Sequence, residues 1–268
     1  MAAGPSSREL PYETGARRAL ELRLEVGLAD EPIRDLWSLV RERGVDLAFH
    51  DFGSNGGDGL YRWNGETALV AANSSTASRL RQRFTVAHEL GHHELHRPDD
   101  GGPLLIADKD IFGRRDPLEE EANSFAGHLL MPDPAIARTL VEWQVTTIDT
   151  TVVARLMQRY GLSYEAVCYR LRNTRRISVG ELDALLRAKE GLSVRALCES
   201  VGFNEFIDFP LPSLLPPAFE SDVLRAYAAG AISDERLAEL LRLPTVEQAL
   251  AHARAAGLAE RDGGELSD

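Results

Sequence analysis

The sequence is poor in cysteine: its 268 residues include only Cys168 and Cys198, and neither belongs to a C-x-x-C pair. Disulfide frameworks and thiolate metal sites need more cysteines, at paired spacings. Both residues lie in helical patterns beside apolar neighbours, where a free thiol behaves as a small hydrophobe. We therefore expect two buried free thiols, and any metal ligands must come from other residue types.

Long apolar runs are also missing. No stretch approaches the roughly 20 apolar residues that a transmembrane helix needs, and residues 1–9 lack the apolar centre of a secretory signal. Both absences favour a cytoplasmic protein without a membrane partner. The 42 acidic residues outnumber the 30 basic ones, and the net charge of −12 argues against broad electrostatic binding of nucleic acid by the whole chain.

What the sequence does contain is the pattern H-E-x-x-H, formed by His88, Glu89 and His92. Residues i and i+4 lie on the same face of an α-helix, so both imidazoles can reach one ion. Glu89 lies about 100° round the helix from His88, which keeps its carboxylate beside the ion without making it a ligand. A catalytic zinc site needs neutral nitrogen ligands, an open position and a carboxylate that accepts a proton from water.

The alternative is a chance match on an ordinary amphipathic helix. The residues around the pattern are uncharged, as a buried metal-binding helix requires; they are Val86, Ala87, Leu90 and Gly91. We predict that Glu89 is the general base, which takes a proton from the attacking water and returns it to the leaving amine. A structural metal site has no use for such a base and is usually closed by four ligands, which argues against a catalytically silent interaction module.

A catalytic zinc site also needs a third protein ligand. The acidic run 119–121 opens the next predicted helix, and Glu119 stands four residues before Asn123. In gluzincins two histidines and one glutamate bind the metal, and an Asp or Asn four residues after that glutamate orients a ligand histidine. We predict Glu119 as the ligand and Asn123 as the orienting residue, with Glu120 as the alternative ligand. The non-functional explanation of the run is that negative charge stabilises a helix N-terminus.

The remaining histidines are weaker ligand candidates. His93 directly follows His92 and points away from its face. His96 is four residues beyond His92, so a ligand role is geometrically feasible, but we expect its side chain to be solvated at the surface. His128 lies on the same predicted helix as Glu119 and is the best histidine alternative.

Helical and strand patterns surround these motifs. Apolar spacing predicts helices at 15–26 and 32–42, and period-two alternation predicts a strand at 45–50. Asn64-Gly65 is a hairpin signal between strands at 60–63 and 67–72. A long helix capped by one of residues 74–76 carries the H-E-x-x-H pattern to about His96, and residues 97–117 form a flap or an irregular connection. Further helices are predicted at 117–131, 134–143, 150–160, 163–172, 179–188, 194–201, 219–229, 234–241 and 246–255.

Two stretches together resemble the ImmA/IrrE metallopeptidases of bacteria, phages and mobile elements. They are residues 83–92, R-F-T-V-A-H-E-L-G-H, and residues 119–132, E-E-E-A-N-S-F-A-G-H-L-L-M-P, within a likeness that runs from about residue 20 to residue 173. The resemblance implies selective cleavage of a helix–turn–helix (XRE-type) transcriptional repressor, which derepresses stress-response or mobile-element genes. It also implies zinc as the metal, with manganese as the alternative. His128 stands where members more often carry small or charged residues, which makes it a pocket candidate.

The expected fold class is α+β and predominantly helical. A zincin-like metallopeptidase core with a small antiparallel sheet, as the resemblance implies, precedes helix–turn–helix-like and C-terminal helical modules. The expected segments are a disordered N-terminus at 1–14, the metallopeptidase domain at 15–145, helix–turn–helix-like helices at 146–176, a C-terminal helical domain at 177–260 and a tail at 261–268.

Two questions stay open at the level of sequence. The donor that supports the oxyanion is not evident, and Tyr160 and Tyr164 are the candidates for it. The rival function is a DNA-binding transcriptional regulator, because residues 150–176 combine helix–turn–helix spacing with six arginines against one acidic residue, Glu165. The family resemblance implies instead that these helices pack beneath the metal site or dock the repressor.

Overall fold

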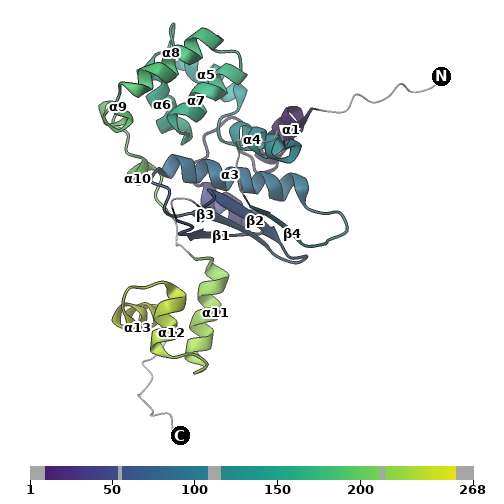
Figure 1. Cartoon of the computed structure of the whole chain (residues 1–268), viewed down its shortest axis with the longest axis vertical. Helices are drawn as coiled ribbons and strands as arrows, with labels where there is room; N and C mark the ends of the chain where they lie inside the picture. Colours follow the sequence, from purple (N-terminus) through teal and green to yellow (C-terminus); the bar gives the residue numbers. More distant parts are fainter. Residues whose placement is uncertain (1–9, 54–55, 108–115, 212–214, 258–268) are drawn as a thin grey trace, which may run out of the picture. The chain divides into compact units, whose positions relative to one another are not determined.

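The computed structural model describes residues 10–53, 56–107, 116–211 and 215–257 (Figure 1). Contacts divide the chain into two compact units, Met1–Pro212 and Ser213–Asp268, and each is described by itself. The domain boundaries predicted near residues 145 and 176 fall inside the first unit and stay predictions. The predicted tail at 261–268 lies outside the described residues. Within the described ranges, no helix combines the length and the apolar character needed to cross a membrane.

A four-stranded sheet lies along one side of the first unit (Figure 1). Its strands are β1 (Val45–His50), β2 (Gly59–Trp63), β3 (Ala68–Asn73) and β4 (Leu104–Ala107), in the order β1-β3-β2-β4. β2 is antiparallel to both β3 and β4, whereas β1 is parallel to β3. The predicted α+β, mainly helical fold class is confirmed, and the small sheet is mixed rather than purely antiparallel.

The hairpin and the edge strand differ in how well the sequence predicts them. Asn64 Oδ1 accepts hydrogen bonds from the backbone N–H groups of Glu66 and Thr67, which closes the predicted turn between β2 and β3. β4 lies in the segment predicted as a flap or irregular connection, and the rest of that segment, residues 108–115, is outside the described residues. The run Leu104–Ala107 has no polar–apolar alternation, so its pairing with β2 is not visible in the pattern.

Helix α3 (Arg79–His96) carries the H-E-x-x-H pattern and packs on β2 and β3 on one side and on α4 (Pro117–Leu130) on another. It begins after the predicted caps at residues 74–76. The Ser78 hydroxyl accepts from the N–H of Arg81 and caps the helix instead. Asn73 Oδ1 accepts hydrogen bonds from the N–H and the hydroxyl of Ser75. Ser75, one of the predicted caps, therefore belongs to a turn before the helix.

Two N-terminal helices complete the packing around α3 and α4. Helix α1 (Pro11–Glu25) starts at a proline, which suits a first helical turn, so residues 11–14 are helical rather than disordered. It lies against α4 so closely that a Cβ on Gly15 would come within 2.9 Å of Phe125 N. Helix α2 (Leu36–Glu42) begins later than the predicted residue 32, because the Asp35 side chain caps it by accepting from the N–H of Ser38.

A layer of further helices shares the core of the first unit. They are α5 (Asp133–Glu142), α6 (Thr150–Tyr160), α7 (Tyr164–Asn173), α8 (Val179–Glu190), α9 (Val194–Ser200) and the short α10 (Glu205–Asp208). Gly161, with φ of +68°, ends α6 in the left-handed conformation that glycine adopts without strain. Cys168 and Cys198 are buried and free, as predicted.

The second unit consists of three helices in its described part. They are α11 (Pro217–Ala228), α12 (Asp234–Leu241) and α13 (Val246–Ala255). Their facing sides bury a small core that includes Val223, Tyr227, Leu237 and Ala249. This separate core makes the unit a compact body of its own.

Candidate metal centre and adjoining cleft

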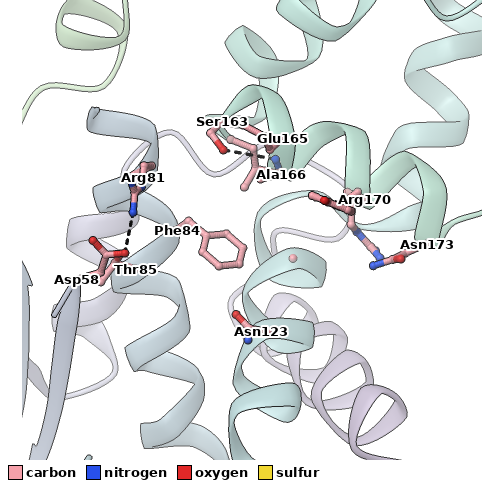
Figure 2. A pocket seen from close by; sticks show the side chains of 13 residues that line it. Asp58, Arg81, Phe84, Thr85, Asn123, Ser163, Glu165, Ala166, Arg170 and Asn173 are labelled. Atoms are coloured by element: carbon pink, nitrogen blue, oxygen red, sulfur yellow. Dashed lines mark hydrogen bonds and ion pairs between the residues drawn. The ribbon is translucent and has the colours of Figure 1, made fainter. Parts of the chain in front are cut away.

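A cleft of about 570 Å³ is lined by residues of α3, α4 and α7. In Figure 2, Arg81 and Asp58 lie at one side of it and Arg170 at the other, with Phe84 and Asn123 between them. Arg81 Nη2 and Asp58 Oδ2 form an ion pair of 2.9 Å. Asn123 both lines the cleft and contacts His88, so the cleft adjoins the predicted metal ligands.

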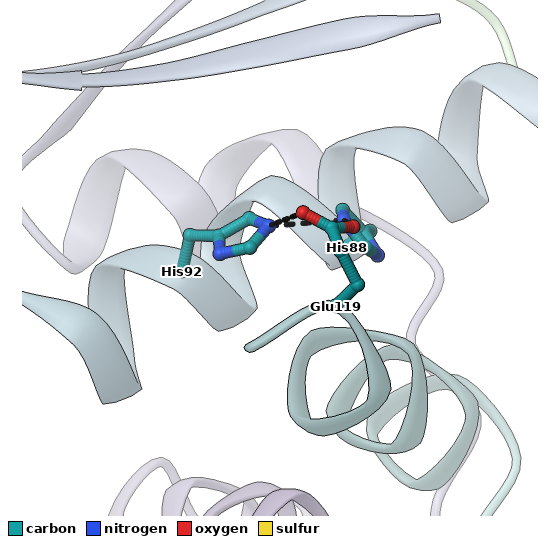
Figure 3. Close-up of side chains that lie close together, drawn as sticks. All are labelled: His88, His92 and Glu119. Atoms are coloured by element: carbon teal, nitrogen blue, oxygen red, sulfur yellow. Dashed lines mark hydrogen bonds and ion pairs between the residues drawn. The ribbon is translucent and has the colours of Figure 1, made fainter. Parts of the chain in front are cut away.

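The structure brings the three predicted ligands together. The candidate ligand atoms of His88 and His92 on α3 and Glu119 in the first turn of α4 all lie within 4.8 Å of one another. The two histidine Nε2 atoms are 3.0 Å apart. The Glu119 carboxylate faces both imidazoles (Figure 3), with Oε2 3.1 Å from His88 Nε2 and Oε1 3.5 Å from His92 Nε2.

These separations suit a single divalent ion. Ligand atoms that lie about 2.0–2.1 Å from a tetrahedral zinc are about 3.3 Å apart, close to the three distances found here. Two imidazoles and one carboxylate are also a donor set that zinc and manganese accept. The alternative ligand Glu120 is exposed, whereas Glu119 lies in the cluster with the two histidines.

Asn123 lies where the sequence predicts an orienting residue. Its Oδ1 is 3.2 Å from His88 Nδ1. An amide oxygen can only accept, so His88 donates from Nδ1 and keeps the lone pair of Nε2 directed at Glu119 and His92. Because residues 119 and 123 are four apart on α4, one helix face supplies both a candidate ligand and the group that orients another.

The second histidine has a different partner. His92 Nδ1 is 2.8 Å from His96 Nδ1, and His96 Nε2 is 3.0 Å from Glu121 Oε2. The His96 side chain is only 5% exposed, so the expectation of a solvated surface histidine is wrong. A signal for this contact exists in the sequence, because His92 and His96 have the same i, i+4 spacing as His88 and His92.

Glu89 is fully buried beside the two histidines. Gly59, the first residue of β2, allows the sheet to approach it: a Cβ at this position would lie 2.7 Å from Glu89 Oε1 and 2.5 Å from Thr85 Cγ2. A second glycine, Gly91, brings α3 and α4 together, since its Cβ would lie 3.1 Å from Ala122 Cα. Neither glycine was singled out from the sequence, because a close approach across elements leaves no local pattern.

The electrostatics of the cluster favour a state that is ready to bind a cation. Hydrogen bonding to His88 and then to His92 holds the pKa of the Glu119 carboxyl well below its usual range. Burial lowers the pKa of the His92 imidazole. The resulting carboxylate and neutral imidazole are the protonation states that metal coordination requires.

The other candidate residues lie elsewhere. His128 Nδ1 donates to Ser124 O at 2.8 Å, its ring packs edge-on to Tyr12, and burial lowers its pKa to about 4. The Tyr160 hydroxyl bonds to Thr139, and the Tyr164 hydroxyl donates to a carbonyl of α8. The structure does not bring these three side chains into the candidate metal centre.

An H-E-x-x-H helix completed by a glutamate from a following helix is the site architecture of one class of proteins, the H-E-x-x-H metallopeptidases. A family model described as the IrrE N-terminal-like domain matches residues 40–172. The chain belongs to the ImmA/IrrE family of metallopeptidases, as the resemblance predicted.

The chain is also similar to two known proteins. It is 35% identical over 144 residues to the radiation response metalloprotease IrrE of Deinococcus radiodurans, an alignment that covers 52% of this chain and 40% of that protein. It is 32% identical over 80 residues to an uncharacterized immunity region protein of Bacillus phage phi105, covering 30% of this chain and 48% of the phage protein. The chain thus spans less than half the length of either relative.

Proposed function

We propose that this chain is a metal-dependent endopeptidase in which His88, His92 and Glu119 bind the ion and Glu89 is the general base. One observation carries the proposal: three side chains from two helices converge at spacings that suit one ion, with a buried carboxylate at the next residue on α3. Zinc is the proposed metal and manganese the alternative, because this donor set suits both.

The roles of the residues follow from their positions. A bound divalent ion would polarise the scissile carbonyl and lower the pKa of the attacking water. Glu89 would take the proton of that water and transfer it to the leaving amine. Asn123 would hold the His88 ring, and the adjoining cleft would receive the substrate chain next to the scissile bond.

The proposed substrate is a helix–turn–helix (XRE-type) transcriptional repressor, whose cleavage would derepress stress-response or mobile-element genes. Family membership supports this class of substrate, together with the names of the two relatives, a radiation response metalloprotease and a phage immunity region protein. Such a substrate would be met in the cytoplasm. Residues 146–176 and the second unit are the parts proposed to dock it.

Direct DNA binding by residues 150–176 is less well supported, because several arginines of this stretch form contacts within the protein. Arg155 stacks on Trp143, with its Cζ 4.0 Å from the ring centroid, and Arg159 pairs with Glu142. Arg170 is buried and donates to a backbone carbonyl. Arginines held in this way are not displayed to phosphates, so no observation favours a DNA-binding function over peptidase activity.

The decisive test is a Glu89→Gln substitution. Purified protein is incubated with the repressors encoded beside its gene, with and without a chelator, and fragments are identified by mass spectrometry. The amide cannot accept the proton, so cleavage should fall by about 10²- to 10⁴-fold while bound metal, measured by elemental analysis, stays at the wild-type level. Glu120→Gln, the same change at an exposed position of the acidic run, should leave cleavage unchanged. Continued cleavage by the Glu89→Gln protein would rule out the proposed mechanism.

A further inference from the structure

His92, His96 and Glu121 form a hydrogen-bonded series that starts at the Nδ1 atom of His92. His92 Nδ1 and His96 Nδ1 are 2.8 Å apart, and His96 Nε2 is 3.0 Å from Glu121 Oε2. His92 is fully buried, and the side chains of His96 and Glu121 are 5% and 20% exposed. Both links are therefore largely shielded from water, where hydrogen bonds orient side chains most strongly.

The chemistry of the two rings fixes the direction of both hydrogen bonds. A neutral imidazole carries one proton, so His92 can offer the Nε2 lone pair to an ion only if its proton is on Nδ1. That proton must then be donated to His96 Nδ1, which has to be an acceptor. His96 consequently carries its own proton on Nε2 and donates it to the Glu121 carboxylate.

We propose that His96 and Glu121 are positioning residues that hold His92 in the tautomer and orientation needed to bind the ion. Ligand histidines usually donate directly to a carboxylate or a carbonyl, whereas here an imidazole lies between the ligand and the carboxylate. The inference rests on the proposed metal site and extends it to two residues outside the H-E-x-x-H and Glu119 ligand set.

The two ligand histidines are thus supported in different ways. His88 donates to the amide of Asn123, which can accept without any change of its own protonation. His92 depends on an acceptor that is itself an imidazole, whose tautomer is in turn selected by Glu121. The support of His92 therefore requires two residues from two helices, α3 and α4.

The test compares two leucine substitutions on the same helix. His96→Leu removes the acceptor, whereas His93→Leu removes a buried histidine that contacts Tyr61 on the sheet side. Zinc affinity is measured by competition with a chelating indicator, and the apo-protein melting temperature is recorded for both. His96→Leu should weaken zinc binding about 10- to 100-fold, while His93→Leu should lower the melting temperature and leave zinc affinity within about twofold of wild type.

Rescue separates positioning from packing. His96→Asn places an amide oxygen near the position of Nδ1, so it should restore most of the affinity that His96→Leu loses. Glu121→Ala should weaken zinc binding severalfold, and Glu120→Ala should not. Imidazole ¹⁵N shifts of the apo protein should show the Nδ1–H tautomer of His92 in the wild type and a mixture of tautomers in the His96→Leu protein.

The outcomes distinguish this inference from the proposed function. If the wild-type protein does not bind zinc or manganese, the proposed function itself fails. If the wild type binds but His96→Leu binds equally well, or if His92 keeps the same tautomer without His96, only the positioning role is overturned. If the His96→Leu protein does not fold, the comparison of Glu121→Ala with Glu120→Ala decides in the same way.

Discussion

The two sides of helix α3 have opposite chemistry. On the side toward α4, His88 and His92 face the carboxylate of Glu119. These three polar groups lie close to one another. The face that carries His93, which contacts Tyr61 of β2, also carries the buried Val86 and Leu90. Residues 86, 90 and 93 share a face by their spacing of four and three, so one face of α3 contributes to the apolar core and another to the candidate metal centre.

The two faces of α3 contribute differently to the stability of the fold and to metal binding. Burying apolar side chains against the sheet stabilises the fold, whereas gathering two imidazoles and a carboxylate in a partly enclosed site carries a desolvation cost unless a cation binds them. Small residues make the arrangement feasible, since Gly59 and Gly91 let β2 and α4 approach α3. Substitutions on the two sides should therefore separate metal binding from stability.

The largest effect is expected from Glu119→Ala. Loss of a ligand should weaken zinc binding by more than the roughly 10- to 100-fold that loss of a supporting residue costs, as measured by chelator competition. The apo-protein free energy of unfolding should fall by about 1–3 kcal/mol, because the change removes the hydrogen bonds of Glu119 to His88 and His92 as well as a charge at the start of α4. Glu120→Ala is the control. Equal zinc affinity of the two variants would mean that the ion is bound elsewhere.

Leu90→Ala should have a smaller effect, and it should lower the stability of the protein rather than its zinc affinity. The side chain is fully buried, so its truncation should lower the free energy of unfolding of the apo protein by about 2–5 kcal/mol. Zinc affinity, measured well below the melting temperature, should stay within a few fold of wild type. Leu24→Ala, at a site that is 72% exposed, should change stability by no more than about 0.5 kcal/mol. A loss of zinc affinity in the Leu90→Ala protein would show that the two sides of α3 are not independent.

The sequence predicts the elements around the site well, because their signals are local. Asn64-Gly65 marks the hairpin, and the H-E-x-x-H spacing marks the metal-binding helix. The boundaries that it misses depend on competing caps: Asp35 starts α2 and Ser78 starts α3, although earlier residues also offer the right chemistry. β4 is missed for another reason, since only its partner β2 defines it as a strand.

The candidate site shows the same limit. Glu119 and Asn123 are found because one helix face imposes their spacing, and the structure brings both to the histidines. His96 is misjudged because its burial depends on Glu121, which lies 25 residues further along the chain. The i, i+4 spacing indicates that His96 can meet His92, but a contact between two helices leaves no periodic signal, so the burial of His96 becomes visible only when the fold is known.

The smallest effect is expected from Tyr160→Phe, which tests a candidate for the oxyanion donor. The hydroxyl is 2.6 Å from Thr139 Oγ1 and donates to Ala135 O at 2.9 Å, both on α5. Its removal should lower the free energy of unfolding, measured with denaturant, by about 0.5–1.5 kcal/mol. The cleavage rate should stay unchanged, because both hydrogen bonds of the hydroxyl go to α5. Tyr164→Phe, whose hydroxyl donates to Leu185 O, should behave alike. If Tyr160→Phe slowed cleavage a hundredfold at wild-type metal content, α6 would have to turn toward the metal centre during catalysis, and this helix would belong to the catalytic side of the molecule rather than to its supporting core.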